Sequence, residues 1–126
     1  MQTERYLQGE KALNQVTMSD GQQVIEGLKD ISPDLGRYIV EFAYGDVIAR
    51  EGLTLQEREL STIAMLGAMK GCEPQLKVHI QGCLNVGCTK DQITETLLQL
   101  AVYAGFPAAI NAMNAAKEVF GKGKMG

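Results

Sequence analysis

Helix-capping signals recur along the whole chain, and no segment alternates apolar and polar residues over the length of a strand. A Ser or Thr followed three residues later by Glu or Gln is typical of a helix start, and glycine is typical of a helix end. These signals divide the 126 residues into seven predicted helices, over approximately residues 3–16, 19–30, 33–50, 54–71, 74–87, 89–105 and 107–121. We therefore expect an all-α fold with six or seven helices in a single domain, residues 1–126.

Four of the predicted helix starts rest on capping signals. Three are capping boxes, formed by Ser19 with Gln22, Thr54 with Glu57, and Thr89 with Gln92. The fourth is Ser32-Pro33, a capping residue followed by proline at the first helical position. In the third helix the predicted apolar side consists of Leu35, Tyr38, Ile39, Phe42 and Ala43. The seventh helix is rich in alanine, and its small side chains favour close packing inside the monomer or against another subunit.

Composition excludes several classes of protein. The net charge of −3 is unlike the basic footprint of a nucleic-acid binder. No apolar run approaches the roughly 20 residues that a membrane span needs, and the polar N-terminus does not resemble a signal peptide. We therefore expect a cytoplasmic protein that binds neither nucleic acid nor membrane.

The chain has three cysteines, Cys72, Cys83 and Cys88. An odd number in a chain without a secretion signal argues against a disulfide scaffold. One interpretation makes Cys83 and Cys88 small buried hydrophobes, but the sequence leaves their roles open. Cys72 lies two turns before His79, on the same side of the predicted fifth helix.

His79 is the one histidine of the chain, and it lies at the edge of an apolar stripe on the fifth helix. A histidine at the margin of a core is either a structural residue with its hydrogen bonds satisfied or a poised acid/base. The sequence pattern alone leaves both interpretations open.

The start of the fourth helix offers charged partners for His79. Glu59 borders the inward stripe of this helix, so its carboxylate is expected to face and orient the histidine. Arg58 and Arg50 are candidates for holding an anionic substrate. The alternative is that these charged groups are solvated, with the acidic residues favoured there by the helix dipole.

A metal site is not expected. Cys72, His79 and Cys83 share a helical face but span about three turns at roughly 1.5 Å per residue. One zinc ion would not easily reach all three, and the sequence has no second cluster of Cys and His.

Several segments, in this order, resemble the core of the carboxymuconolactone decarboxylase family. They are residues 42–50, 58–60, 71–73, 76–79, 84–89 with Ile93, and 99–109. The resemblance implies the all-helical fold shared with alkylhydroperoxidase-D enzymes, and a homotrimer or homohexamer. It also implies decarboxylation of 4-carboxymuconolactone to 3-oxoadipate enol-lactone in aromatic-compound degradation, without a cofactor.

The peroxidase branch of this superfamily uses Cys-x-x-Cys-x-x-x-His. Counting back from His79 puts its cysteines at positions 72 and 75, but position 75 is Gln. The dithiol is therefore incomplete, and Cys83 is too far along a rigid helix to replace it. We expect a decarboxylase with His79 as acid/base, Glu59 as its partner and Arg58 or Arg50 as carboxylate clamps. The alternatives are a thiol peroxidase using Cys72, and a non-catalytic oligomeric binding protein.

Overall fold

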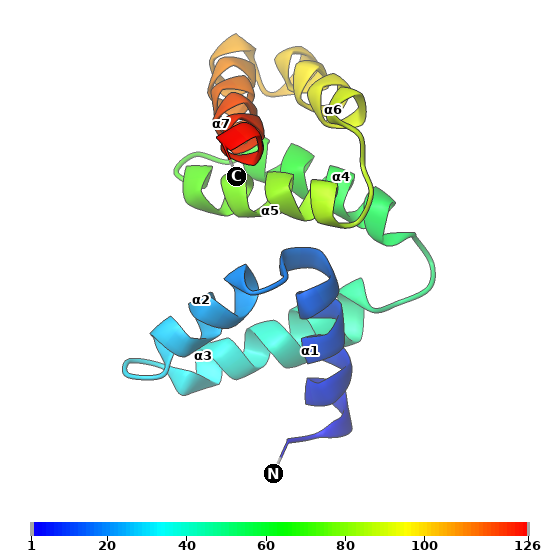
Figure 1. The fold of residues 1–126 in the computed structure, drawn as a ribbon, viewed down its shortest axis with the longest axis vertical. Helices are drawn as coiled ribbons and strands as arrows, with labels where there is room; N and C mark the ends of the chain where they lie inside the picture. The colour runs from blue at the N-terminus through cyan, green and yellow to red at the C-terminus, as the bar shows by residue number, and fades with distance from the viewer. Residues whose placement is uncertain (1, 126) are drawn as a thin grey trace. The chain divides into compact units, whose positions relative to one another are not determined.

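The computed structural model describes residues 2–125, and over these residues the regular structure is entirely helical (Figure 1). The helices are α1 (Glu4–Thr17), α2 (Asp20–Leu28), α3 (Pro33–Tyr38), the π-helix η1 (Ile39–Ile48), α4 (Leu55–Ala68), α5 (Glu73–Asn85), α6 (Lys90–Tyr103) and α7 (Phe106–Met125). The predicted all-α class is confirmed. None of the described helices combines the length and apolar character that a bilayer crossing requires.

The backbone groups into two compact units, Met1–Leu55 and Gln56–Gly126. Each unit has its own packing and is described by itself. The expectation of one domain over residues 1–126 stays a prediction.

Close packing of α1 against η1 organises the N-terminal unit. Gly9 makes it possible, because a Cβ at this position would lie far inside contact distance of the Val40 carbonyl oxygen and 3.0 Å from the Gly45 nitrogen. A polar clamp supports the same contact: the buried Glu41 carboxylate accepts hydrogen bonds from the Thr3 hydroxyl and the Arg37 guanidinium.

The predicted apolar side of the third helix is wrong at three of its five residues. Leu35, Tyr38 and Phe42 are about half exposed or more, whereas Val40 and Tyr44 are buried. For Phe42 the reason is the π-helix, whose hydrogen bonds join residues five apart, as in the 2.9 Å bond from the Ala49 N–H to the Tyr44 oxygen. The wider turn moves residues around the axis, so a pattern read at 3.6 residues per turn loses its phase.

Three of the four predicted start signals can be compared with the structure. Ser32 caps α3 by accepting from the Leu35 N–H, with Pro33 in the first turn, and Thr89 with Gln92 forms the predicted capping box. The box at Ser19 is wrong, since its backbone is already helical and its side chain makes no capping bond. The Thr17 hydroxyl accepts from the Gly21 N–H instead, at 3.0 Å.

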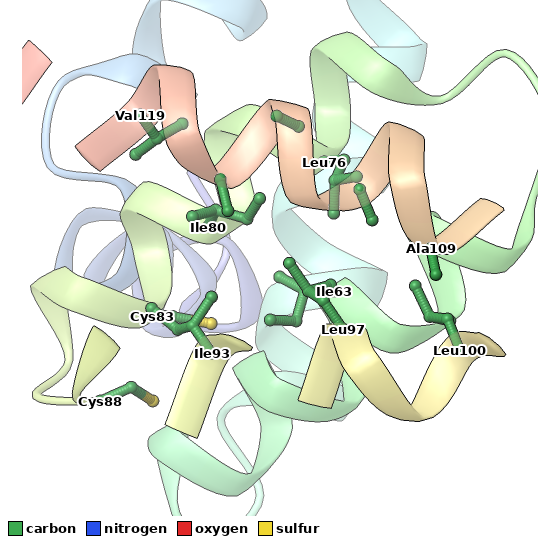
Figure 2. Close-up of a cluster of buried hydrophobic side chains, with 13 residues drawn as sticks. Ile63, Leu76, Ile80, Cys83, Cys88, Ile93, Leu97, Leu100, Ala109 and Val119 are labelled. Carbon is green, nitrogen blue, oxygen red and sulfur yellow. The ribbon is translucent and has the colours of Figure 1, made fainter. Parts of the chain in front are cut away.

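The C-terminal unit has a larger apolar core, built from α4, α5, α6 and α7 (Figure 2). Ile63, Ile80, Ile93 and Leu97 are fully buried at its centre. The alanine-rich face of α7 lines the same core through Ala109, Ala112, Ala115 and Ala116. That face therefore packs inside the monomer, and α7 continues past the predicted end at Gly121 to Met125.

Candidate active site

A buried carboxylate and the single histidine meet between α4 and α5. His79 Nδ1 lies 2.7 Å from Glu59 Oε1. The Glu59 side chain is 1% exposed and the His79 side chain 19% exposed. The expected pairing of these two residues across the helices is therefore present in the structure, and His79 lies at the margin of the core, as its position in the apolar stripe predicted.

The geometry assigns different tasks to the two ring nitrogens. A carboxylate oxygen accepts hydrogen bonds, so Nδ1–H donates to Glu59 and the ring orientation is fixed. Nε2 is left to exchange a proton with a bound molecule. A histidine oriented by a carboxylate in this way is a recurrent acid/base arrangement.

Arg58 precedes Glu59 in the first turns of α4 and is half-buried. Its Nε atom is buried and makes no hydrogen bond among the described residues, although the residue has other contacts. A planar guanidinium has the shape and charge to bind a carboxylate through two hydrogen bonds. Arg58 is thus the sequence neighbour of Glu59, and its role as a carboxylate clamp stays a prediction.

Arg50 lies in the N-terminal unit, just after η1. There it borders a cavity of about 250 Å³ together with Lys11 and Glu51. Because it belongs to the other unit, a role for Arg50 as a second clamp also stays a prediction.

Cys72 occupies the position before the first residue of α5, without a side-chain capping bond. Its thiol is free and half-buried, and its Sγ lies 3.8 Å from the Lys70 oxygen. Position 75, where the peroxidase motif has its second cysteine, is an exposed Gln. A redox role for Cys72 stays a prediction.

Cys83 and Cys88 are free and buried in the core of the C-terminal unit, as one interpretation of the sequence proposed. Burial raises the pKa of the Cys83 thiol well above its ordinary value, and the neighbouring Cys88 and Glu59 make smaller contributions in the same direction. Burial also raises the pKa of Cys88. Both thiols therefore stay protonated and neutral near pH 7.

Sequence reasoning missed the contact between these two thiols. The signal was present: Gly87 stands between them at a helix end, and a positive φ there brings together the residues on either side of the turn.

Among the described residues, no group of three or more His, Cys, Asp and Glu side chains is arranged to hold a metal ion.

Comparison with known proteins agrees with the motifs. The sequence profile of the carboxymuconolactone decarboxylase family matches residues 33–118. The chain is 44% identical to 4-carboxymuconolactone decarboxylase of Acinetobacter baylyi over 96 residues, which cover 76% of this chain and 71% of that protein. It is 31% identical over 99 residues to an uncharacterized 15.0 kDa protein of Paracoccus denitrificans, covering 76% and 72%. It is 39% identical over 75 residues to nitrosuccinic acid decarboxylase of Metarhizium robertsii, covering 60% and 52%.

Proposed function

Because the chain belongs to the carboxymuconolactone decarboxylase family, we propose that it is a carboxy-lyase whose acid/base centre is the Glu59–His79 pair. The observation that carries this proposal is the 2.7 Å contact of His79 Nδ1 with a fully buried carboxylate. A buried carboxylate needs a partner, and a histidine with one nitrogen fixed presents the other to substrate.

The substrate is a small carboxylated lactone of the 4-carboxymuconolactone type, and the product is the corresponding enol-lactone. The bond from the carboxylate carbon to the ring breaks, CO2 leaves, and its bonding electron pair is delocalised into the conjugated lactone. His79, protonated on both nitrogens, then delivers the Nε2 proton to the ring carbon next to the lactone carbonyl, and the carbon that lost CO2 becomes the oxygen-bearing end of the enol-lactone double bond. Solvent restores that proton, so the cycle consumes one proton and needs no cofactor.

Arg58 acts earlier in this scheme, as a clamp for a substrate carboxylate. Its fixed charge makes it suited to bidentate binding, and its place beside Glu59 supports the assignment. Arg50 is a second candidate clamp. The physiological setting that follows from such a substrate is the degradation of aromatic compounds.

The test is turnover of 4-carboxymuconolactone, followed by CO2 release. His79→Gln keeps a polar side chain of similar reach but cannot titrate, so it should lower kcat by a factor of roughly 100 to 10,000. Gln75→Ala, an exposed change on the same helix, should leave kcat near that of the unchanged protein. A folded His79→Gln protein with normal kcat would remove His79 from the mechanism.

The thiol peroxidase alternative is tested in the same preparations. It requires that the unchanged protein reduce hydroperoxides when a thiol reductant is supplied, and that Cys72→Ser abolish this activity. If Cys72→Ser still decarboxylates the substrate and the unchanged protein does not reduce hydroperoxides, the peroxidase alternative is excluded and the decarboxylase remains. Hydroperoxide turnover without CO2 release would reverse that conclusion.

We also propose that the protein is a homo-oligomer, either a trimer or a hexamer. Support comes from large apolar side chains of the C-terminal unit that are more than half exposed: Met65, Met69, Val102, Tyr103, Phe106 and Ile110. Met65 and Tyr103 border an open cavity of about 530 Å³ between α4 and α6. Apolar surface of this kind is typical of protein–protein contacts. A monomer mass in light scattering at micromolar concentration would contradict the proposal.

A further inference from the structure

The end of α5 is a Schellman motif that brings two cysteines together. The Cys88 N–H donates to the Cys83 oxygen at 2.9 Å, and the Gly87 N–H donates to the Leu84 oxygen at 3.1 Å. Gly87 has a φ of +101°, as this turn requires. The side chains that flank such a motif normally make an apolar contact, and here both are thiols, visible together at one end of the core in Figure 2.

The two thiols form a short chain of hydrogen bonds from α5 to α4. A hydrogen bond between the two thiols raises the pKa of Cys83 and opposes the rise at Cys88. The Cys88 S–H in turn donates to the Gln56 oxygen, with a sulfur–oxygen distance of 3.8 Å.

This chain runs beside the Glu59–His79 pair. On α4, Gln56 and Glu59 are three residues apart; on α5, His79 and Cys83 are four apart, so each pair shares one helical face. The two helices are thus joined by two adjacent cross-links: Glu59 with His79, and Gln56 with the thiols. The Glu59 carboxylate also contributes to the raised pKa of both thiols.

On the side of the two thiols, the surroundings of the Glu59–His79 pair are apolar. Cys83 and Ile80 are fully buried on α5, and α6 contributes Ile93. The charged group in contact with His79 is Glu59 of α4. Close by in sequence are Arg58 on α4 and Lys77 on α5, and Lys77 is paired with Glu118 of α7 at 2.6 Å. Among the described residues, His79 is the hydrogen-bond partner of Glu59.

We propose that Cys83 and Cys88 are positioning residues of the acid/base centre: their hydrogen-bonded layer joins α4 to α5 and excludes water from Glu59, so that the carboxylate is directed to His79. The inference rests on the proposed function for its catalytic meaning. Its structural part does not rest on the proposed function, because it concerns the orientation and titration of the His79 ring in the absence of substrate.

The test uses the single histidine as a spectroscopic probe. We follow the 15N signals of the His79 ring against pH in the full chain, together with kcat, KM and the melting temperature. Cys88→Ala removes the sulfur that joins Cys83 to Gln56. Water then reaches Glu59 and screens its charge, so the midpoint of the ring titration should move to lower pH by roughly half a unit or more. The loss in kcat should be about tenfold, with little change in KM.

Two further variants separate positioning from packing. Cys88→Ser keeps a donor and an acceptor, so it should restore most of the titration midpoint and of kcat. Val119→Ala shortens another side chain of the same core, on α7, and should lower the melting temperature without moving the midpoint. If the Cys88→Ala protein does not fold, Cys83→Ala repeats the test with the Cys88–Gln56 bond still available.

The possible outcomes are distinct. A lower titration midpoint in Cys88→Ala, with recovery in Cys88→Ser, supports the positioning role. This holds even if no substrate tried is decarboxylated. A lack of decarboxylation would count against the proposed function and not against the positioning role. A midpoint in the folded alanine variant equal to that of the unchanged protein would overturn the positioning role. So would equal shifts in Cys88→Ala and Val119→Ala.

Discussion

The two units of the chain are stabilised in different ways. The N-terminal unit depends on close backbone contact between α1 and η1 through Gly9, and on the buried Glu41 carboxylate that joins Thr3 and Arg37. The C-terminal unit depends on a continuous apolar core, with Glu59 and His79 at its margin. Backbone contact tolerates no added atom, whereas side chains can adjust. The same small substitution should therefore have unequal effects in the two units.

The largest effect on stability is expected for Gly9→Ala. The added Cβ meets the Val40 carbonyl group, with the carbonyl carbon only 2.8 Å away, so α1 and η1 must separate. We expect a loss of about 3 kcal/mol in the free energy of unfolding, at the upper end for overpacking. Urea titration followed by circular dichroism measures it.

Gly27→Ala is the matched control in α2, where an added Cβ has no neighbour within 4 Å. It should leave stability unchanged or raise it by about 0.5–1 kcal/mol, because alanine favours a helix more than glycine does. Equal stability of the Gly9→Ala and Gly27→Ala proteins would contradict the account of the N-terminal unit.

The second expected effect is a loss of stability at alkaline pH that originates in the C-terminal unit. Burial raises the pKa of Cys83 from the ordinary thiol value of 9.0. The folded state therefore holds its proton where the unfolded chain releases it, so the stabilisation is complete below pH 9 and is lost as pH rises toward the folded pKa. Above pH 9 the free energy of unfolding should fall by up to about 1.4 kcal/mol per pH unit for this thiol.

Denaturant titrations at pH 8 and pH 10 check this slope in the unchanged protein and in Cys83→Ala. The variant has no thiol at this position and should show a shallower dependence. Identical slopes in the two proteins would show that Cys83 does not contribute to the pH dependence.

The smallest expected effect is that of Gly67→Ala in α4. The added Cβ would lie 2.6 Å from Leu100 Cδ1, the end of a flexible side chain, and 3.6 Å from the Ala112 Cβ. Leu100 can rotate, so we expect a cost of about 1 kcal/mol, the low end for overpacking. A cost equal to that of Gly9→Ala in the same urea titration would erase the difference between the two units.

The sequence predicted much of this structure because local signals decide helix ends. The capping box at Thr89 and the proline after Ser32 act within one turn, so they can be recognised without knowing the fold. The pairing of Glu59 with His79 was also predictable, since both border apolar stripes on successive helices.

Other features depend on contacts that the sequence does not display. The π-helix changes the phase of the apolar pattern, which is why Phe42 is exposed and Glu41 is buried. Thr17 replaces Ser19 as the acceptor for the Gly21 N–H because two helices meet there. The thiol layer was not predictable from the sequence, because it depends on a contact of Cys88 with the Gln56 oxygen, 32 residues away in sequence.

The central claim is that Glu59 and His79 act as one acid/base unit, and a double-mutant cycle on kcat tests it most directly. Glu59→Gln removes the orienting charge and should lower kcat less than His79→Gln, which removes the proton carrier. Because residues that act as a unit are not additive, the Glu59→Gln/His79→Gln protein should turn over at the same rate as His79→Gln alone. If the two losses instead multiply in a folded double variant, the residues act independently and the account of the site is wrong.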